Sequence, residues 1–390
     1  MPARSPDTGL ILMGGGARAA YQVGVLDALR ELLREAGHHP DRLPFDVICG
    51  TSAGAINAAA LATHCDDFHG AVGRLLAIWS SFHAHQVYRT DLRGSLGNAA
   101  HWLTSVALGW LARNPPRSLF DNAPLAELLR GLMDFERMRR GMADGKLRAL
   151  AISASRYTSG QHITYYESRE AVPPWSRTQR LACPATIDCE HLLASSAIPF
   201  VFPAVALPLG SRREYFGDGS MRQIAPISPA IHLGADRILI VGVGQLQGGT
   251  PQPTHTGSQY LYPNLAQIAG HAMAGIFLDA LASDLERLTR INATISLIPE
   301  ERRAGSRLRP IEVLLISPSR RLDSLAARHV RALPWTVRSL LRTIGATEKR
   351  GAALASYLLF EADYLNELIT LGRLDTLRQR RQVLRFFDAE

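Results

Sequence analysis

Cysteine is scarce in this sequence, and the few cysteines fit no common cysteine-based site. They are Cys49, Cys65, Cys183 and Cys189, with no CxxC pair and no spaced set of cysteines and histidines. Structural zinc sites and disulfide frameworks depend on such patterns. We therefore expect neither a metal site nor a disulfide framework.

Long apolar runs are also missing. No run reaches the roughly 18 residues that a membrane-spanning helix requires. Residues 1–21, MPARSPDTGLILMGGGARAAY, lack the long apolar region and the small-residue cleavage site of a secretory signal. The sequence thus predicts a cytoplasmic protein. Peripheral attachment to the inner face of a membrane is compatible with these features.

Lysine is almost absent, since Lys146 and Lys349 are its two occurrences among 43 basic residues. The formal net charge is nevertheless +8, carried by arginine. Arginine binds phosphate groups well, which favours nucleic acid or anionic lipid as a partner, although a GC-rich genome would give the same composition. Because no DNA- or RNA-binding module is recognisable, nucleic acid is not expected.

The composition is that of a globular protein, with 46 % apolar and 20 % charged residues. The first 64 residues alternate between strand-like and helix-like segments. Apolar runs at 9–13 and 45–49 are followed by helical patterns at 21–37 and 55–64. A strand followed by a crossover helix is typical of a parallel sheet. The sequence therefore predicts an α/β fold with a mainly parallel central sheet.

The remainder of the chain continues this mixture. Residues 65–145 have mostly helical patterns, and 248–260 is rich in the residues of a flexible loop. A proline-punctuated loop is expected at 194–205, after a short helix. Further strands are predicted at LRALAIS (147–153), HITYYES (162–168), REYFGDGS (213–220), RILIVGVG (237–244), ATISLIP (293–299) and IEVLLIS (311–317).

Three consecutive glycines follow the first predicted strand. A dinucleotide-binding fingerprint would need a glycine where Ala19 stands and an acidic residue about 20 positions later, so no nucleotide cofactor is expected. The backbone amides of Gly14, Gly15 and Gly16 could instead bind an anion or a transient oxyanion, with Arg18 steadying it. A tight turn without a binding role is the remaining alternative.

The stretch FDVICGTSAGAINAAAL contains the pattern Gly-x-Ser-x-Gly between a predicted strand and a predicted helix. This is the nucleophile-elbow pattern, in which small neighbours allow a sharp turn that exposes the serine hydroxyl. Gly50, Thr51, Ala53 and Gly54 would form the turn around Ser52. The helix N-terminus behind the serine favours developing negative charge. The alternative is a serine that merely caps an ordinary helix.

A serine nucleophile needs a group that accepts its proton. The histidines that follow the acidic candidate Asp218 are His232, His255, His271 and His329. None of them follows a strand, as the histidine of a hydrolase triad should. Asp218 itself lies between Gly217 and Gly219 after a strand-like run, and burial could raise the pKa of its carboxyl enough to make it a base. An aspartate-glycine turn at a hairpin is the alternative.

Taken together, the sequence blocks resemble the bacterial patatin-like phospholipase family. MGGGARAAYQVGVL, GTSAGAINA, ASSAIPFVFPAV and DGS occur in the order of that family, and SLFDNAPLAELL resembles its bacterial branch. The resemblance implies a three-layer α/β/α fold with a mainly parallel central sheet. It places a catalytic domain at residues 8–245, followed at 246–390 by a mostly helical, arginine-rich extension that packs on it.

The resemblance also implies a chemistry. Ser52 would be the nucleophile and Asp218 the general base and acid, without a histidine, a metal or another cofactor. Gly14, Gly15 and Gly16 would form the oxyanion hole with Arg18 nearby, and Gly219 would belong to the aspartate loop. The substrate would be a phospholipid or lysophospholipid, cleaved at an acyl ester bond through an acyl-serine intermediate.

The chain departs from the family pattern at two positions. Ala19 replaces the last glycine of the first block, and Ser220 stands where the family has glycine or alanine after Asp-Gly. Neither change removes a reacting group, so we expect an active enzyme. Two other functions fit the same residues: a carboxylesterase or acyltransferase for soluble esters, and a catalytically silent lipid-binding or regulatory protein.

Two segments could meet a lipid surface. WLTSVALGWL (102–111) could form a lid or an interfacial helix, with a helix buried against the sheet as the alternative. Segment 320–345 is basic and amphipathic and is interrupted by Pro334, which favours anionic headgroups, with a solvated helical face as the alternative. Its arginines are Arg320, Arg321, Arg328, Arg331, Arg338 and Arg342.

Overall fold

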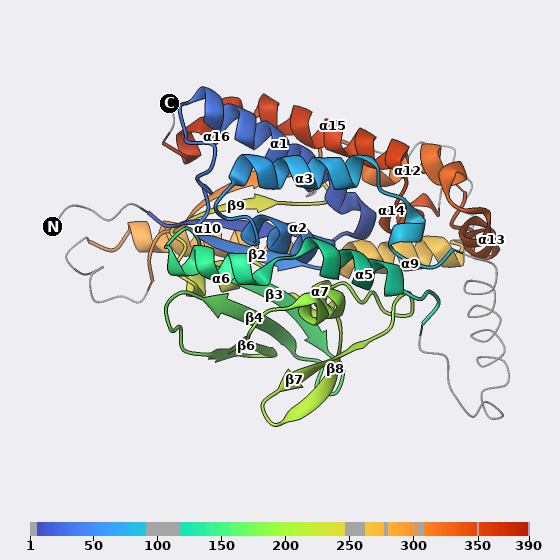
Figure 1. The fold of residues 1–390 in the computed structure, drawn as a ribbon, viewed down its shortest axis with the longest axis horizontal. Helices are drawn as coiled ribbons and strands as arrows, with labels where there is room; N and C mark the ends of the chain where they lie inside the picture. Colours follow the sequence, from blue (N-terminus) through green and yellow to red (C-terminus); the bar gives the residue numbers. More distant parts are fainter. Residues whose placement is uncertain are drawn as a thin grey trace.

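A computed structural model describes residues 6–90, 118–245, 262–276, 280–299, 302, 308–348 and 351–388. Within these residues ten strands form one sheet, with helices on both of its faces (Figure 1). The segments 102–111 and 248–260 lie outside the described residues. None of the described helices combines the length and the apolar composition that crossing a membrane requires.

The centre of the sheet is parallel, in the order β10-β9-β1-β2-β3. These strands are β1 (Thr8–Leu12), β2 (Val47–Thr51), β3 (Ala149–Arg156), β9 (Arg237–Val241) and β10 (Glu312–Ile316). Their residues alternate between two buried faces. On β1, Leu10 and Leu12 join one hydrophobic core, whereas Ile11 and, just after the strand, Met13 join the other. Because both faces are apolar, both must be covered, which confirms the predicted three-layer fold.

Beyond β3 the sheet continues with antiparallel pairs, except that β4 and β6 run parallel. The additional strands are β4 (His162–Ser168), β5 (Trp175–Arg177), β6 (Arg180–Pro184), β7 (Val205–Leu209) and β8 (Arg212–Asp218). β4 pairs with β3, and β8 pairs both with β7 and with the last residues of β3. The final pair of the β3–β8 ladder is Ala154 and Asp218. Residues 154 and 155 of β3 pair with β4 on one edge and with β8 on the other, which is the edge that also carries β2, where Thr51 pairs with Ser153. The end of β3 therefore brings the ends of β2 and β8 together.

Most helices contribute to the larger core on one face of the sheet. They are α1 (Ala20–Glu35), α2 (Ala53–Ala62), α3 (Phe68–Ser80), α5 (Ala123–Leu132), α6 (Phe135–Ala143), α7 (Cys189–Ser195), α9 (Leu265–Ala274), α12 (Leu322–His329), α13 (Trp335–Thr343), α14 (Ala352–Leu358), α15 (Ala362–Arg378) and α16 (Arg380–Phe386). The opposite face is covered by α8 (Ser228–His232) and α10 (Ala280–Ser296).

The C-terminal residues are built into the fold. Helix α15 lies against α1, beside α3 (Figure 1). The two helices approach closely at glycines: a Cβ on Gly24 would overlap the carbonyl oxygen of Ile369, and one on Gly372 would overlap that of Tyr21. In addition, β10 forms an edge of the central sheet. The predicted division at residue 245 therefore runs through a shared sheet.

One predicted strand is wrong. Residues 293–296 of ATISLIP form the last turn of helix α10, whereas IEVLLIS does contain the predicted strand, β10. The helix is held by Asn292, whose side-chain amide donates to the carbonyl of Ile311 at 2.7 Å and accepts from its backbone N–H at 3.1 Å. Ile295 is buried on the same helix. These contacts, distant in sequence, outweigh the strand-like pattern of β-branched residues.

Candidate active site

Ser52 lies in a strained turn between β2 and α2. Its backbone has φ of +55° and ψ of −132°, an unusual conformation for a residue with a side chain. The turn depends on its glycines. A Cβ on Gly50 would lie 2.5 Å from the Cα of Ala55, and one on Gly54 would overlap the carbonyl oxygen of Leu12. The sequence pattern Gly-x-Ser-x-Gly therefore has a steric cause, and its serine is only 1 % exposed.

Asp218 ends β8 directly beside this turn. The Ser52 hydroxyl donates a hydrogen bond of 2.5 Å to Oδ2 of Asp218. The other carboxylate oxygen accepts from the backbone N–H of Ser220 at 2.8 Å, which fixes the orientation of the carboxylate. Gly219 allows the following backbone to come close, because a Cβ there would overlap the carbonyl oxygen of Ser153. The structure thus brings together the two residues that the sequence singled out as nucleophile and base.

Burial raises the pKa of Asp218 to about 6. Hydrogen bonds from Ser52 and Ser220 oppose this rise, because they stabilise the charged carboxylate. An aspartate with such a pKa is largely ionised at neutral pH and is a stronger base than an ordinary one.

The candidate histidines lie elsewhere. His232 stacks on Trp175 with ring centroids 4.7 Å apart, and His329 pairs with Glu367 at 2.8 Å. His271 is exposed on α9, and His255 lies outside the described residues. Among the described histidines, none hydrogen-bonds to Ser52 or Asp218.

The glycine run lies between β1 and the short 3-10 helix η1 (Gly16–Ala19). Gly16 has φ of +55°, and a Cβ at this position would overlap the carbonyl oxygen of Tyr357 on α14. A Cβ on Gly15 would meet the side chain of Val243 at 2.6 Å. Gly14 precedes these two in the same buried loop. Gly16 lines the same pocket as Ser52, which brings the loop to the nucleophile.

The guanidinium of Arg18 is bound by α14. Its Nε donates to the hydroxyl of Ser356 at 2.8 Å, and the guanidinium carbon lies 4.0 Å from the centre of the Tyr357 ring. A terminal nitrogen also reaches the carbonyl of Ala353 at 3.4 Å. Only 5 % of Arg18 is exposed. The side chain therefore fastens the glycine loop to the C-terminal part of the chain.

Two polar side chains that were not predicted from the sequence support the turn. The hydroxyl of Ser195 accepts the backbone N–H of Ser52 at 2.9 Å, and the amide of Gln223 donates to the Thr51 hydroxyl at 2.8 Å. The neighbouring Ser196 lines the pocket and has a buried hydroxyl without a hydrogen-bond partner among the described residues. The two adjacent serines in ASSAIPF were the one sequence feature that could have indicated these contacts. Nothing local in that block shows that they lie against a turn far earlier in the chain.

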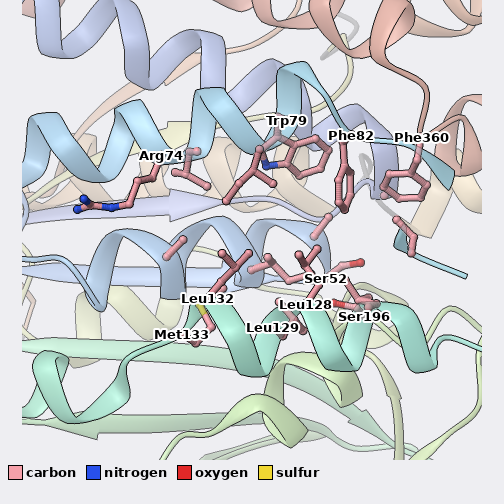
Figure 2. Close-up of a pocket in the computed structure, with 18 of the residues that line it drawn as sticks. Ser52, Arg74, Trp79, Phe82, Leu128, Leu129, Leu132, Met133, Ser196 and Phe360 are labelled. Atoms are coloured by element: carbon pink, nitrogen blue, oxygen red, sulfur yellow. The ribbon is translucent and has the colours of Figure 1, made fainter. Parts of the chain in front are cut away.

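An apolar pocket leads away from Ser52. Figure 2 shows it between α3 and α5, with Ser52 and Ser196 near one end and Arg74 at the other. Trp79 and Phe82 form the wall on the α3 side. Most of the remaining lining is aliphatic. Such a pocket can hold a hydrocarbon chain while Ser52 reacts with a group at its end.

Comparison with known proteins identifies the family of the chain. A family model described as patatin-like phospholipase matches residues 10–231, more than half of the chain. The chain belongs to the patatin-like phospholipase family. The match includes the glycine loop, the serine turn and Asp218.

Three proteins similar to this patatin-like chain match it over a short segment or at low identity. A segment of 58 residues is 50 % identical to lysophospholipase nte1 of Aspergillus terreus, covering 15 % of this chain and 3 % of the fungal protein. VipD from Legionella pneumophila is 13 % identical, with a TM-score of 0.31 over 94 % of this chain and 67 % of that one. The type III effector ExoU is 14 % identical, with a TM-score of 0.28 over 94 % and 54 %.

The two departures from the patatin-like pattern fit their surroundings. Ala19 is fully buried, and its carbonyl accepts a hydrogen bond of 3.2 Å from the side chain of Asn57. The backbone N–H of Ser220 donates a hydrogen bond to Asp218, and the hydroxyl of Ser220 is buried.

Within the described ranges, no three histidine, cysteine, aspartate or glutamate side chains gather where they could hold a metal ion.

Proposed function

We propose that this protein is a serine acyl hydrolase that cleaves fatty-acyl ester bonds of phospholipids or lysophospholipids. The observation that carries the proposal is the 2.5 Å hydrogen bond between Ser52 and the buried carboxylate of Asp218, at one end of an apolar pocket. Membership of the patatin-like phospholipase family supports the reaction class.

The reaction proceeds in two halves. Asp218 accepts the hydroxyl proton of Ser52 as the serine oxygen attacks the acyl carbonyl carbon, forming a tetrahedral oxyanion. The C–O bond to the alcohol then breaks, and Asp218 gives its proton to the departing alcohol. In the second half a water molecule loses a proton to Asp218 and attacks the acyl-serine. The fatty acid leaves and the proton returns to Ser52.

Two backbone features stabilise the oxyanion in this account. The backbone amides of the loop Gly14–Gly16 donate hydrogen bonds to the oxyanion, and Ser52 is the N-cap of α2, where the helix dipole favours negative charge. Arg18 acts indirectly, by holding the loop against α14 through Ser356. Neither feature requires a metal or a cofactor.

The pocket favours a fatty-acyl substrate over a short soluble ester. Its lining is almost wholly apolar beyond the reacting serine, so each methylene of a bound chain leaves water on binding. Such a gain is much smaller for acetate or butyrate esters. The carboxylesterase and acyltransferase alternatives share the same Ser52 and Asp218 and differ in this preference.

We further propose that α13 contacts the membrane. Trp335 is 54 % exposed at the start of this helix, and Arg331 and Arg342 are exposed nearby. Among the described residues, no carboxylate forms an ion pair with Arg331, Arg338 or Arg342. An exposed tryptophan with unpaired arginines is suited to an anionic lipid surface.

The substrate proposal is tested by measuring release of fatty acid from lysophosphatidylcholine, diacyl phosphatidylcholine and 4-nitrophenyl butyrate. We expect the lysophospholipid or the phospholipid to be cleaved with the higher kcat/KM and Ser52→Ala to be inactive on all three. Ser81→Ala, at an exposed serine on the surface, is the matched control. A preference for butyrate would support the soluble-ester alternative. Cleavage of none of the three would contradict hydrolysis.

A further inference from the structure

The pocket follows the whole length of α2. The residues of this segment that line it are Ala53, Ile56, Ala60 and, just after the helix, His64. Their spacing of three or four residues places them in one stripe along the helix. At a rise of 1.5 Å per residue, Ala60 lies about 12 Å and His64 about 18 Å along the helix axis from Ser52. The pocket is therefore a channel with a defined direction and length.

Two other helices complete the walls. On α5 the lining runs from Leu125 to Leu132, and on α3 it runs in the opposite direction, from Trp79 to Arg74 (Figure 2). The lining residues of all three helices therefore give the channel the same direction. Trp79 lies toward the Ser52 end, whereas Arg74 and Leu132 lie at the far end.

The far end is polar and close to the surface. Arg74 forms an ion pair with Asp67 at 3.2 Å, and the two side chains are 46 % and 34 % exposed. Leu132, on the opposite wall, is 37 % exposed. A chain atom that reaches this point leaves apolar surroundings and meets a charged pair and water.

We propose that this channel binds one acyl chain lengthwise and that Ala60 and Arg74 set its preferred length. The inference rests on the proposed hydrolysis at Ser52 and deepens it. An extended chain advances about 3.5 Å over three bonds, as extended polypeptide backbone does. A channel of about 18 Å therefore holds an acyl chain of roughly 14 to 16 carbons. The favoured substrates are therefore long, linear acyl esters whose chain ends near Arg74.

A dependence on chain length follows from this shape. Each buried methylene strengthens binding by up to about fourfold, and a methylene beyond Arg74 is not buried and adds little. The value of kcat/KM should therefore rise with chain length and level off at about 14 to 16 carbons.

The test compares 4-nitrophenyl butyrate, octanoate, dodecanoate and hexadecanoate in wild type and Ala60→Phe. The phenyl ring would fill the channel about 12 Å from Ser52, beyond roughly ten carbons of chain. We expect kcat/KM for hexadecanoate to fall at least about tenfold relative to that for butyrate. Ala77→Phe is the matched control, since this alanine is on the exposed face of α3 and does not line the channel.

A second variant lengthens the channel instead of blocking it. Arg74→Leu replaces the charged end with an apolar side chain and leaves Asp67, which caps α3, in place. We expect kcat/KM for octadecanoate to rise severalfold relative to dodecanoate. An unchanged chain-length profile in both variants, with wild type active, would overturn the channel assignment while leaving the hydrolysis intact. A wild type that cleaves none of the esters would instead overturn the proposed function.

Discussion

The hydroxyl of Ser52 and the carboxylate of Asp218 are joined by a hydrogen bond of 2.5 Å, although 166 positions separate the two residues. The contact exists because Ser52 follows β2 and Asp218 ends β8, and both strands pair with the end of β3, Thr51 opposite Ser153 and Asp218 opposite Ala154. A nucleophile and a base positioned by neighbouring strands are rigidly held.

The rate of hydrolysis should depend on the ionisation of Asp218. Its pKa is raised to about 6, and only the ionised carboxylate can accept the proton of Ser52. We expect kcat/KM to increase about tenfold per pH unit below that value and to level off above it. A profile from pH 4.5 to 8.5 with a soluble ester measures this. A rate that stays constant down to pH 4.5 would exclude Asp218 as the base.

The same carboxylate should lower the stability of the folded protein as pH rises. Its pKa is above the ordinary value of 3.8, so the stabilising effect is present at low pH and is lost as pH rises through about 6. Between pH 5 and 8 the loss amounts to about 1.4 kcal/mol for this one group.

Urea unfolding of wild type and Asp218→Asn at these two pH values isolates the effect, because other groups contribute equally to both proteins. The advantage of Asp218→Asn over wild type should be about 1.4 kcal/mol larger at pH 8 than at pH 5. Asp144→Asn, at an exposed aspartate, is the control variant. A pH-independent difference between wild type and Asp218→Asn would contradict the raised pKa.

Arg18 should act on the rate constant more than on substrate affinity. Its side chain holds the glycine loop against Ser356 and Tyr357, and in Arg18→Met this attachment is lost while the side-chain volume is roughly kept. Because small displacements of a catalytic group are costly, we expect kcat to fall about 10- to 100-fold with KM within about threefold. Arg320→Met at an exposed position is the control. A variant that folds and retains wild-type kcat would refute the positioning role.

The close approach of α1 and α15 should make Gly372 sensitive to a single methyl group. A Cβ there would overlap the carbonyl oxygen of Tyr21, so Gly372→Ala should lower the free energy of unfolding by about 1–3 kcal/mol. Gly131→Ala is the matched control, since nothing lies within 4 Å of the added atom on α5. There alanine should be neutral or stabilise by up to about 1 kcal/mol. Thermal or urea unfolding measures the change in the free energy of unfolding for each variant. Equal changes at both glycines would contradict the tight crossing of α1 and α15.

Membrane contact by α13 should depend on Trp335. Trp335→Ala combined with Arg338→Gln removes an interfacial aromatic and one positive charge, so binding to vesicles containing phosphatidylglycerol should weaken about tenfold. Sedimentation with vesicles measures the binding. Leu297→Ala is the control, because Leu297 is 83 % exposed on another part of the surface. Equal binding by the double variant and the control would contradict the assignment of α13.

Local patterns account for what could be predicted from the sequence. Strands β1 and β2 and the turns after them were predicted because their glycines have steric roles that depend on nearby backbone, as at Gly50 and Gly54. Asp218 was predicted in the same way, from its flanking glycines. Its partnership with Ser52 followed from the order of the family motifs and required the structure to give the distance.

What was missed depends on contacts between distant parts of the chain. The direction of the Arg18 side chain is set by α14, more than 300 residues later. The supporting hydroxyl of Ser195 and the apolar channel likewise require the helices to be placed in space. The short strands β5, β6 and β7 carry charged residues or proline, so their patterns are weak, and they form because neighbouring strands pair with them.

The most direct test of the account is the behaviour of Asp218→Asn toward a fluorophosphonate probe and a fluorogenic acyl ester. Wild type should be labelled on Ser52, identified by mass spectrometry, and Asp218→Asn should lose activity by about 10²- to 10⁴-fold while remaining folded. Asp144→Asn should behave as wild type. Nearly full activity in Asp218→Asn, or labelling at a residue other than Ser52, would contradict the pairing of this serine with this aspartate.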